Sequence, residues 1–431
     1  MGDLSATNGG EIASEGGFGR DSSGRATLGG RPLAELLNEA GVPTPAYFYD
    51  LSAIRRRVED IDRAFEGAPH LIAYAIKANS AGSIVRTVRD AGAGVDAVSG
   101  GELLLARRAG VEARKIVLSG VAKRNDELDL ALGEDILAIQ AESVGELARI
   151  AERSRALGKK ARVSVRVNPS VQIESHAHIA TGHDAAKFGV ARRDLGSAFE
   201  YFEANRDALT LTGISTHVGS MLRSPESYVA SANVVCDVAE EARRRDHALT
   251  YVDFGGGFGI DYGSAPADPP PSFARAALEL LKLRGLSDLT IVVEPGRSIV
   301  GSFGVLVTSV VQHKQSGARS WIMIDAGMND LLRPALYGAR HRIEPLESLP
   351  GETEHQVVGP VCESTDDFGV FAVGDVPEKL VIRDAGAYSF SMASEYNARP
   401  LPAEIFVQDG RVAHVSPSPG VESWIARRLG A

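Results

Sequence analysis

The apolar positions of the chain follow two patterns, one on each side of residue 300. Before it, short apolar runs alternate with segments of helical spacing, the first of which covers 52–64. Eight runs have the character of buried strands: 71–76, 94–98, 116–118, 136–139, 163–167, 211–215, 251–254 and 291–293. Strands that alternate with helices predict a parallel sheet, and eight repeats predict a (β/α)8 barrel of the TIM type. The helix over 52–64 is expected to complete the ring, in place of a helix after the eighth run.

After residue 300 the apolar runs are separated by turn residues and not by long helices. They occupy 305–312, 321–325, 356–361, 379–382, 404–407 and 412–415, and Asp409 and Gly410 form a hairpin signal between the last two. We therefore expect a mainly β, sandwich-like or barrel-like C-terminal domain over 301–431 and the barrel domain over 46–300. The segment 26–45 is expected to pair with the β domain, because 25–28 looks like a strand that the barrel does not need. Residues 1–25 are rich in glycine and serine and are expected to form a mobile tail.

Composition excludes several classes of function. Of 431 residues, 44% are hydrophobic and 24% are charged, which is ordinary for a globular protein. The 46 basic and 56 acidic residues give a net charge of −10, which argues against a nucleic-acid or membrane-surface partner. The sequence shows no run of transmembrane length and no signal-peptide pattern at its start. Two distant cysteines, Cys236 and Cys362, suggest neither a disulfide framework nor a metal site, so we expect a cytoplasmic protein.

Lys77 is the first candidate for chemistry, because it follows the first predicted strand directly. A buried lysine should have a lowered pKa, and its free amine could then condense with an aldehyde. Taken alone, a lysine that extends its ammonium group from a strand edge into solvent is the commoner situation. The residues at the other strand ends favour the reactive amine, because functional groups of such barrels come from the C-terminal ends of the strands.

The residues at those ends suit one planar, phosphorylated cofactor. A glycine run lets backbone N–H groups approach a phosphate, a histidine ring can stack on a flat ring, and a carboxylate can keep a pyridine nitrogen protonated. Each feature has an ordinary alternative, namely a turn, a core histidine or an ion pair. Together they indicate pyridoxal 5′-phosphate (PLP). The candidates, in chain order, are Lys77, Asp96, Arg166, His217, Ser220, Gly255, Gly256, Gly257, Glu294 and Arg297.

Six motifs carry a resemblance to a known family. They are Ala-Ile-Lys-Ala-Asn at 75–79, His-Val-Gly-Ser at 217–220, Gly-Gly-Gly-Phe-Gly at 255–259, Glu-Pro-Gly-Arg at 294–297, Cys-Glu-Ser at 362–364 and Asp-Ala-Gly-Ala-Tyr at 384–388. In this order they resemble the fold-type III PLP-dependent decarboxylases. The stretches 325–330, 333–337 and 396–397 make the chain most similar to the diaminopimelate decarboxylases within that family. The similarity runs from about residue 44 to about residue 407.

The resemblance implies roles for individual residues. Lys77 would hold PLP covalently, His217 would stack on its ring and Glu294 would bind its nitrogen. Its phosphate would be met by Ser220, Gly256, Gly257, Arg297 and Tyr388, and its other contacts would include Asp96, Arg166, Gly255 and Gly296. The far carboxylate of an amino-acid substrate would be held by Arg297, Arg333 and Tyr337, and its far ammonium by Glu363. Tyr388 would be a further substrate-binding residue.

The resemblance further implies a homodimer with shared active sites. Cys362 and Glu363 would reach the Lys77 of the other subunit, and the Cys362 thiol would return a proton to the reacting carbon. Cysteine is chemically suited to that step, because its thiol titrates close enough to neutrality. Lys77, His217, Glu294 and Cys362 are thus the expected catalytic residues, and meso-2,6-diaminopimelate is the expected substrate, converted to L-lysine and CO2.

Three departures from the family pattern leave the substrate more open than the chemistry. They are Ala186 in place of a serine, Met221 near a usual glutamine and Arg340 in place of an aromatic residue. A decarboxylase of the same chemistry could act on another diamino acid or on a carrier-linked amino acid. An amino-acid racemase would usually place an arginine at the pyridine nitrogen, so Glu294 argues against one. A catalytically inactive regulatory homologue is the alternative from another class, and the retained Lys77, His217 and Cys362 argue against it.

Overall fold

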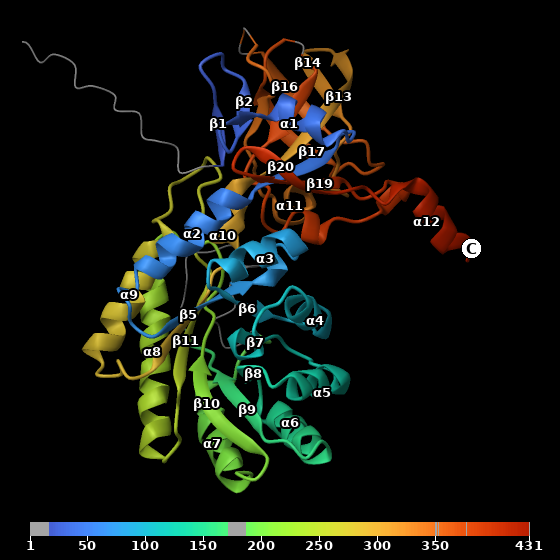
Figure 1. Cartoon of the computed structure of the whole chain (residues 1–431). Helices are drawn as coiled ribbons and strands as arrows, with labels where there is room; N and C mark the ends of the chain where they lie inside the picture. The colour runs from blue at the N-terminus through green and yellow to red at the C-terminus, as the bar shows by residue number, and fades with distance from the viewer. Residues whose placement is uncertain (1–16, 171–186, 350, 352, 376, 431) are drawn as a thin grey trace, which may run out of the picture.

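The computed structural model describes residues 17–170, 187–349, 351, 353–375 and 377–430. Two regions lie one above the other in Figure 1, a barrel surrounded by helices and a mainly β domain. Both regions share one large hydrophobic core cluster, which continues from the barrel helices to Ile324 and Phe406 of the β domain.

Eight parallel strands close the barrel, as the sequence predicts. Going around it, the order is β10-β11-β12-β5-β6-β7-β8-β9, with each strand paired to its neighbours in parallel. The strands are β5 (His70–Ala75), β6 (Gly94–Ala97), β7 (Ile116–Leu118), β8 (Ala138–Ala141), β9 (Ala161–Arg166), β10 (Leu209–Ser215), β11 (Tyr251–Gly256) and β12 (Thr290–Glu294). Parallel strands are covered on both faces, which explains why these runs are nearly continuous in apolar residues.

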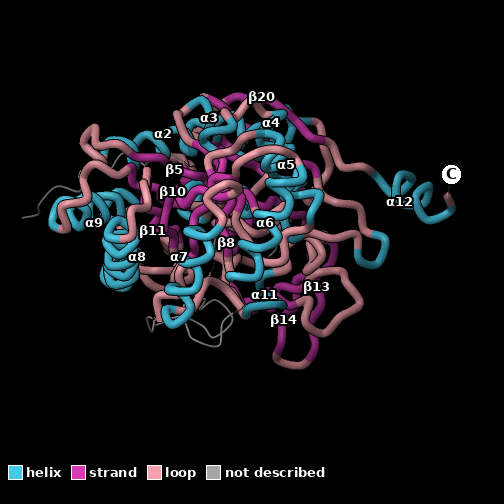
Figure 2. The backbone as a smooth tube through the Cα atoms, turned by 90° about the horizontal axis from the view of Figure 1, so that it is seen from below, coloured by secondary structure: helices cyan, strands magenta, loops and turns pink. Residues whose placement is uncertain are grey.

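Helices surround the strands, as the view from the barrel end in Figure 2 shows. They are α3 (Gly82–Asp90), α4 (Gly100–Arg108), α5 (Asn125–Glu134), α6 (Val144–Ala156), α7 (Leu195–Ala204), α8 (Glu226–Arg244) and α9 (Pro270–Leu283). The helix that completes the ring is α2 (Leu51–Arg63), which packs between α3 and α9. Its buried face includes Ile54, Val58 and Ile61, and the Asp50 carboxylate caps its first turn by accepting from the Ala53 N–H. The predicted closure is therefore confirmed.

The β domain contains a nine-stranded sheet with β13 (Gly304–Ser316) at its centre. The other strands are β4 (Ala46–Asp50), β14 (Arg319–Ile324), β15 (Ile343–Pro345), β16 (Glu354–Val358), β17 (Asp367–Ala372), β18 (Lys379–Ile382), β19 (Ala403–Gln408) and β20 (Arg411–Ser416). Asp409 and Gly410 both have positive φ, of 50° and 72°, as the tight hairpin between β19 and β20 requires. The hairpin prediction is confirmed, whereas β15 and β17 were not predicted.

The expected start of the barrel at residue 46 is corrected by β4. This strand lies between β13 and β19 in the sheet of the β domain, antiparallel to the first and parallel to the second. All five of its residues are buried, and Tyr49 stacks on Phe406 of β19 with 5.3 Å between ring centroids. The chain thus crosses the β domain once before α2 enters the barrel.

The N-terminal segment also differs from its prediction. The strands β1 (Phe18–Arg20), β2 (Ala26–Leu28) and β3 (Arg31–Pro32) form a small sheet of their own, followed by α1 (Leu33–Ala40). The β-domain core packs against it, and the Ala26 N–H donates to the carbonyl of Leu346. The predicted tail over 1–25 is therefore wrong from residue 17 onward, and residues 1–16 lie outside the described part of the chain.

The short helices α10 (Arg297–Val300) and α11 (Arg333–Tyr337) lie near the junction of the two regions, and α12 (Gly420–Leu429) ends the described chain. The sequence did not predict α12. It projects from the β domain in both Figure 1 and Figure 2, and its Arg427 forms an ion pair with Glu395. Among the described residues, no helix combines the length and apolarity needed to cross a bilayer.

Candidate active site

A cleft of about 1580 Å³ opens between the C-terminal ends of the barrel strands and the β domain. Ten of the predicted site residues line it: Lys77, His217, Ser220, Gly257, Glu294, Gly296, Arg297, Arg333, Tyr337 and Tyr388. Residues from distant strand ends and from the β domain thus share one cavity. Six others do not line it within a single chain: Asp96, Arg166, Gly255, Gly256, Cys362 and Glu363.

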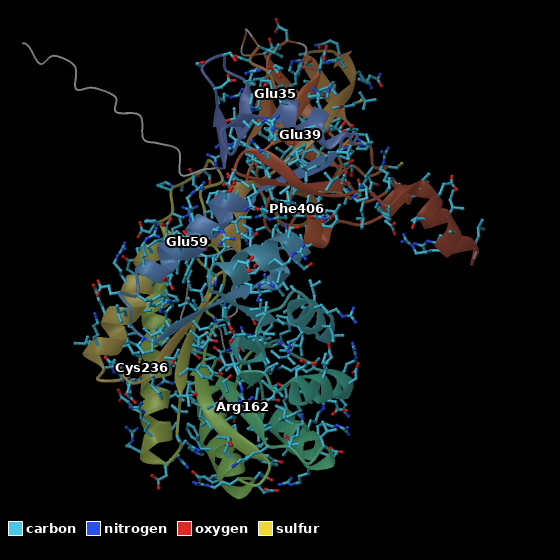
Figure 3. All side chains as sticks on the ribbon, in the orientation of Figure 1. Glu35, Glu39, Glu59, Arg162, Cys236 and Phe406 are labelled. Carbon is cyan, nitrogen blue, oxygen red and sulfur yellow. The ribbon has the colours of Figure 1, made fainter. Side chains whose placement is uncertain are left out.

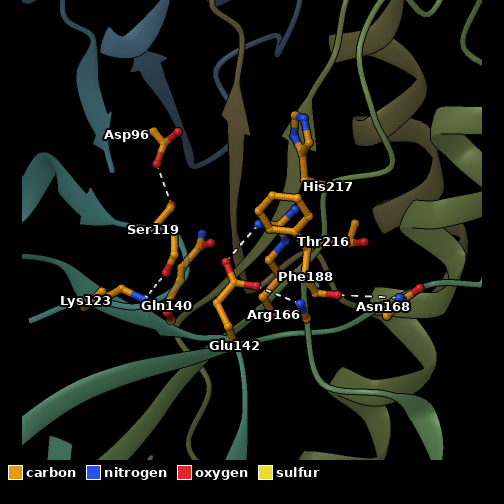
Figure 4. Close-up of polar contacts among 12 residues, drawn as sticks. Asp96, Ser119, Lys123, Gln140, Glu142, Arg166, Asn168, Phe188, Thr216 and His217 are labelled. Atoms are coloured by element: carbon orange, nitrogen blue, oxygen red, sulfur yellow. Dashed lines mark hydrogen bonds and ion pairs between the residues drawn. The ribbon is translucent and has the colours of Figure 1, made fainter. Parts of the chain in front are cut away.

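Lys77 sits in a single helical turn directly after β5, and its ammonium group is paired with an acid. Its Nζ lies 2.9 Å from Oδ2 of Asp96, a fully buried carboxylate that also accepts a hydrogen bond from Ser119 Oγ. Figure 4 shows the contact between Asp96 and Ser119. Burial alone lowers the pKa of Lys77, but the Asp96 carboxylate, with smaller contributions from Tyr388 and Glu294, outweighs it and raises that pKa. The expected lowered pKa is therefore wrong for this state, and the amine must lose a proton before it can attack an aldehyde.

Glu294, at the end of β12, belongs to a buried acid pair that the sequence analysis missed. Nε2 of Gln140 donates to Oε1 of Glu294 at 3.0 Å and to Oδ2 of Asp253 at 2.7 Å. Burial raises the pKa of Glu294 far above its usual range and that of Asp253 to about 7, and the nearby negative charges of other acids add to both effects. The available signal was that Gln140 directly follows the apolar run 136–139 and that Asp253 is a polar residue inside the run 251–254.

The glycine run at the end of β11 lets three backbone segments come together. A Cβ on Gly256 would lie 2.0 Å from the Glu294 carbonyl oxygen, and one on Gly257 would lie 2.2 Å from that of Gly219. The Gly256 N–H donates to Nδ1 of His217 at 3.3 Å, so this nitrogen presents its lone pair. Burial, together with the charges of Arg166 and Lys77, lowers the pKa of His217 to about 3, which leaves a neutral flat ring facing the cleft. Gly255 and Gly256 therefore shape the floor, and Gly257 lines the cavity.

The guanidinium of Arg166, at the end of β9, contacts other side chains of the same chain. Its Nη1 lies 2.9 Å from Oε1 of Glu142, and its guanidinium lies 4.8 Å from the centre of the Phe188 ring (Figure 4). The other oxygen of Glu142 accepts from the Gly189 N–H at 2.7 Å. Arg166 thus anchors the residues around Phe188, which lines the cleft. Its predicted contact with the cofactor stays a prediction.

Two arginines that line the cleft are held by neutral partners. Arg297 donates to the Tyr262 hydroxyl at 2.8 Å and to Ser220 Oγ at 3.1 Å, and Arg333 Nη1 lies 2.7 Å from Nε2 of His341. Within the described part of the chain, no aspartate or glutamate forms an ion pair with either arginine. The Nε of Arg297 is buried and has no hydrogen-bond partner among the same residues. Burial and the charge of Arg297 lower the pKa of Arg333, so this end of the cleft is suited to an anion.

Cys362 and Glu363 lie on an exposed turn of the β domain, outside the cleft of their own chain. The strand before the turn ends at Val358, earlier than predicted, and the Asp366 carboxylate holds the turn by accepting from the Val361 N–H at 2.7 Å. Oε1 of Glu363 accepts from the Tyr396 hydroxyl at 2.5 Å. Neither residue therefore serves the cavity of its own chain in this arrangement.

The second cysteine, Cys236, lies on the outer helix α8 (Figure 3). It is fully buried, and burial raises the pKa of its thiol to about 12. Cys236 is therefore part of the hydrophobic core.

Two of the three departures from the family pattern lie in the cleft. Met221 lines it with a positive φ of 67°, and Arg340 lines it with its guanidinium 5.7 Å from the centre of the Phe371 ring. Ala186 lies outside the described residues. Tyr262 and His341 are lining residues that the sequence analysis missed.

The cavity suits PLP by its donor set. It brings together an amine, a neutral flat ring, a buried acid and a guanidinium with an unpartnered buried N–H. These are the groups that an aldehyde, a pyridine ring and a phosphate require. Within the described ranges, no group of three or more histidine, cysteine, aspartate or glutamate residues is arranged to hold a metal ion.

Comparisons with known proteins agree with this assignment of the cofactor. Residues 51–301 match the family model described as "Pyridoxal-dependent decarboxylase, pyridoxal binding domain". Diaminopimelate decarboxylase of Aquifex aeolicus is 38% identical over 90% of this chain and 92% of its own length, and that of Zymomonas mobilis is 36% identical over 91% and 93%.

Solved structures give the same result. The diaminopimelate decarboxylase of Helicobacter pylori complexed with L-lysine superimposes with a TM-score of 0.85 at 35% identity, covering 93% of this chain and 100% of that one. The diaminopimelate decarboxylase of M. jannaschii in complex with L-lysine gives a TM-score of 0.88 at 30% identity, covering 95% and 97%.

Proposed function

Because the chain belongs to the diaminopimelate decarboxylase family of PLP-dependent enzymes, we propose that it converts meso-2,6-diaminopimelate to L-lysine and CO2. One observation carries this proposal. Arg297 and Arg333 lie in the cleft that Lys77 and Glu294 also line, and no acid among the described residues forms an ion pair with either arginine. A substrate with a second amino-acid end would place its far carboxylate there. The product would make the enzyme part of lysine biosynthesis.

The residues of the cleft would hold PLP from several sides. Lys77 would carry it covalently, the neutral His217 ring would lie against its ring, and Ser220, Gly257, Gly296, Arg297 and Tyr388 would surround its phosphate. PLP, when bound, supplies an electron sink for the carbanion that remains after CO2 leaves. Glu294 would keep the pyridine nitrogen protonated, while the Gln140 amide orients the carboxylate of Glu294.

The remaining steps are proton movements and substrate orientation. Lys77 must pass a proton to solvent or substrate before its amine can react, and Asp96 holds that amine in place. Arg297, Arg333 and Tyr337 would bind the far carboxylate of the substrate. Cys362 would return a proton to the reacting carbon, and Glu363 would hold the far ammonium group.

We also propose a homodimer in which Cys362 and Glu363 complete the site of the other subunit. Their exposed turn does not line the cleft of its own chain, which supports a role at a neighbouring cleft. A cytoplasmic location is proposed as well, because both cysteines, Cys236 and Cys362, are free thiols.

The test is release of CO2 from meso-, LL- and DD-diaminopimelate by the purified protein with PLP. D- and L-lysine, ornithine and arginine serve as competing substrates. We expect turnover of the meso isomer above all others. Turnover of ornithine or lysine with none of meso-diaminopimelate would refute the proposed substrate and retain the decarboxylase chemistry.

The dimensions of the cleft support one alternative substrate class. Its volume of about 1580 Å³ exceeds the roughly 300–1000 Å³ of ordinary small-molecule sites, and Arg340 is among the residues that line it. A carrier-linked amino acid of the same chemistry would use that space. Activity on an N-acylated or peptide-linked diamino acid that exceeds activity on free diaminopimelate would favour this alternative.

A further inference from the structure

Arg333 is held by a histidine with a single possible arrangement of protons. His341 and Arg333 are only 3% and 6% exposed. A guanidinium has donors only, so Nε2 of His341, 2.7 Å from Arg333 Nη1, must present its lone pair. The proton then sits on Nδ1, which donates to the Arg383 carbonyl oxygen at 2.9 Å. These two partners assign one neutral tautomer to His341.

The surroundings keep this ring neutral and the guanidinium oriented. Burial, with the charges of Arg333 and Arg297, lowers the pKa of His341 to about 3. The Tyr262 ring meets the His341 ring edge-on at 5.2 Å, and the Arg333 guanidinium lies over the Tyr262 ring at 4.6 Å. Arg333 is therefore contacted on one edge by His341 and on one face by Tyr262, and both partners are uncharged.

A neutral partner has a consequence that an acid would not have. An aspartate or glutamate could hold Arg333 in place, but it would neutralise the charge that a ligand carboxylate needs. We propose that His341 is a positioning residue: it fixes the direction of the Arg333 guanidinium and leaves its charge available to the far carboxylate of the substrate. This inference rests on the proposed function, in which Arg333 binds that carboxylate.

The experiment compares two ligands that differ by one carboxylate, L-lysine and 1,5-diaminopentane. Their dissociation constants for the PLP-loaded enzyme are measured by calorimetry. In His341→Phe, which keeps a ring but loses the acceptor, we expect L-lysine to bind about tenfold more weakly, because a hydrogen bond to a charged group is lost. Binding of 1,5-diaminopentane should be unchanged. KM for diaminopimelate should rise by a similar factor with kcat near wild type, because the far carboxylate is bound alike before and during the reaction.

Two further variants separate positioning from a loss of stability. His341→Gln can present an amide oxygen near the place of Nε2 and should restore most of the L-lysine affinity, whereas the shorter His341→Asn should not. His355 is the matched control, since it is also buried in the β domain and has both ring nitrogens occupied, by Ser320 Oγ at 2.8 Å and the Gly374 carbonyl at 2.9 Å. His355→Phe should leave both dissociation constants unchanged.

The outcomes distinguish the inference from the proposed function. A wild-type enzyme that binds L-lysine no better than 1,5-diaminopentane has no far-carboxylate site, and both proposals then fail. A wild-type preference for L-lysine that persists in His341→Phe overturns the role of His341 alone. If His341→Phe does not fold, equal affinities of the Gln and Asn variants overturn it, and a preference for the Gln variant supports it.

Discussion

Two parts of the site differ in their charge balance. In the first part, the reacting end, Lys77 Nζ lies 2.9 Å from the Asp96 carboxylate, and the Gln140 amide donates to both Glu294 and Asp253. In the second part, the recognition end, Arg297 and Arg333 are held by Tyr262 and His341, which are neutral. The ionisable groups of the reacting end shift one another's pKa values, whereas no acid among the described residues forms an ion pair with the two arginines of the recognition end.

The difference shows how one cavity can both react and select. A reacting end needs ionisable groups whose proton affinities are set by close neighbours. A recognition end needs charge that remains free until a ligand supplies its complement.

The largest effect is expected from Lys77→Ala, which removes the covalent attachment of PLP, and from Cys362→Ala, which removes the proposed proton donor. Each variant should be nearly inactive, yet a mixture should recover activity after subunit exchange. In a mixed dimer one site carries both lesions and the other carries neither. Random exchange makes half the dimers mixed, so recovery should approach about a quarter of wild type for a two-fold interface.

The matched control for this mixing experiment is Cys236→Ala. Cys236 is buried in the barrel wall, so this variant should keep its activity without mixing. Absence of recovery despite proven exchange of subunits would mean that each chain builds its site alone.

Glu294→Gln should lower kcat by about a hundred- to a thousandfold, the usual range for loss of one preorganised electrostatic contact. PLP should remain bound, because Lys77 and the phosphate contacts are untouched. The decrease should appear in kcat more than in KM, since the carbanion needs stabilisation only near the transition state. Steady-state kinetics measures kcat and KM, and the absorbance spectrum of the bound cofactor measures PLP retention. A kcat near wild type would show that Glu294 does not stabilise the carbanion through the pyridine nitrogen.

Glu363→Ala tests the recognition end and should act mainly on KM. Loss of a charge-assisted contact costs about 1.5–3 kcal/mol, so KM for diaminopimelate should rise roughly ten- to a hundredfold. Tyr396→Phe is the control, because it removes only the hydroxyl that Glu363 contacts within its own chain. If Glu363→Ala discriminates between diaminopimelate and lysine as the wild type does, recognition lies elsewhere, for example at Arg340.

The smallest effect is expected from Asp253→Asn, measured as the pH dependence of stability without PLP. Burial raises the pKa of the Asp253 carboxyl from 3.8 to about 7. Between these values the folded protein keeps a proton that the unfolded chain has lost, so stability falls as the pH rises from about 4 to about 7. In Asp253→Asn, the decrease in Tm between about pH 4 and about pH 7 should be smaller by a few degrees.

Glu404 provides the comparison for this prediction. Burial raises the pKa of this β-domain carboxyl to about 7 as well, and the carboxyl accepts from the Tyr49 hydroxyl at 3.0 Å. Glu404→Gln should flatten the same stability curve but leave the pH titration of bound PLP unchanged. Asp253→Asn should alter both, because Gln140 connects it to Glu294. If the pH titration of bound PLP is unaltered in Asp253→Asn, then Asp253 does not influence the protonation of the cofactor through Glu294.

Features that depend on local pattern could be predicted from the sequence alone. Eight apolar runs specified the barrel strands, because parallel strands are buried on both faces. Lys77, His217 and Glu294 lie within two residues after the ends of three of those runs, which placed them at one end of the barrel, since parallel strands end on the same side. The hairpin at Asp409 and Gly410 followed from residues that tolerate positive φ.

Features that depend on neighbours distant in the chain could not be predicted in this way, because they arise when the chain folds. Gln140 is separated by 113 residues from Asp253 and by 154 from Glu294, and only barrel closure brings the three together. The pKa of Lys77 moves opposite to the prediction because burial brought Asp96 with it. The place of β4 in the β domain and the contact of His341 with Arg333 were likewise decided by packing between the two regions. Local pattern carries no information on such pairs, because electrostatic energy depends on distance in space and not on distance along the chain.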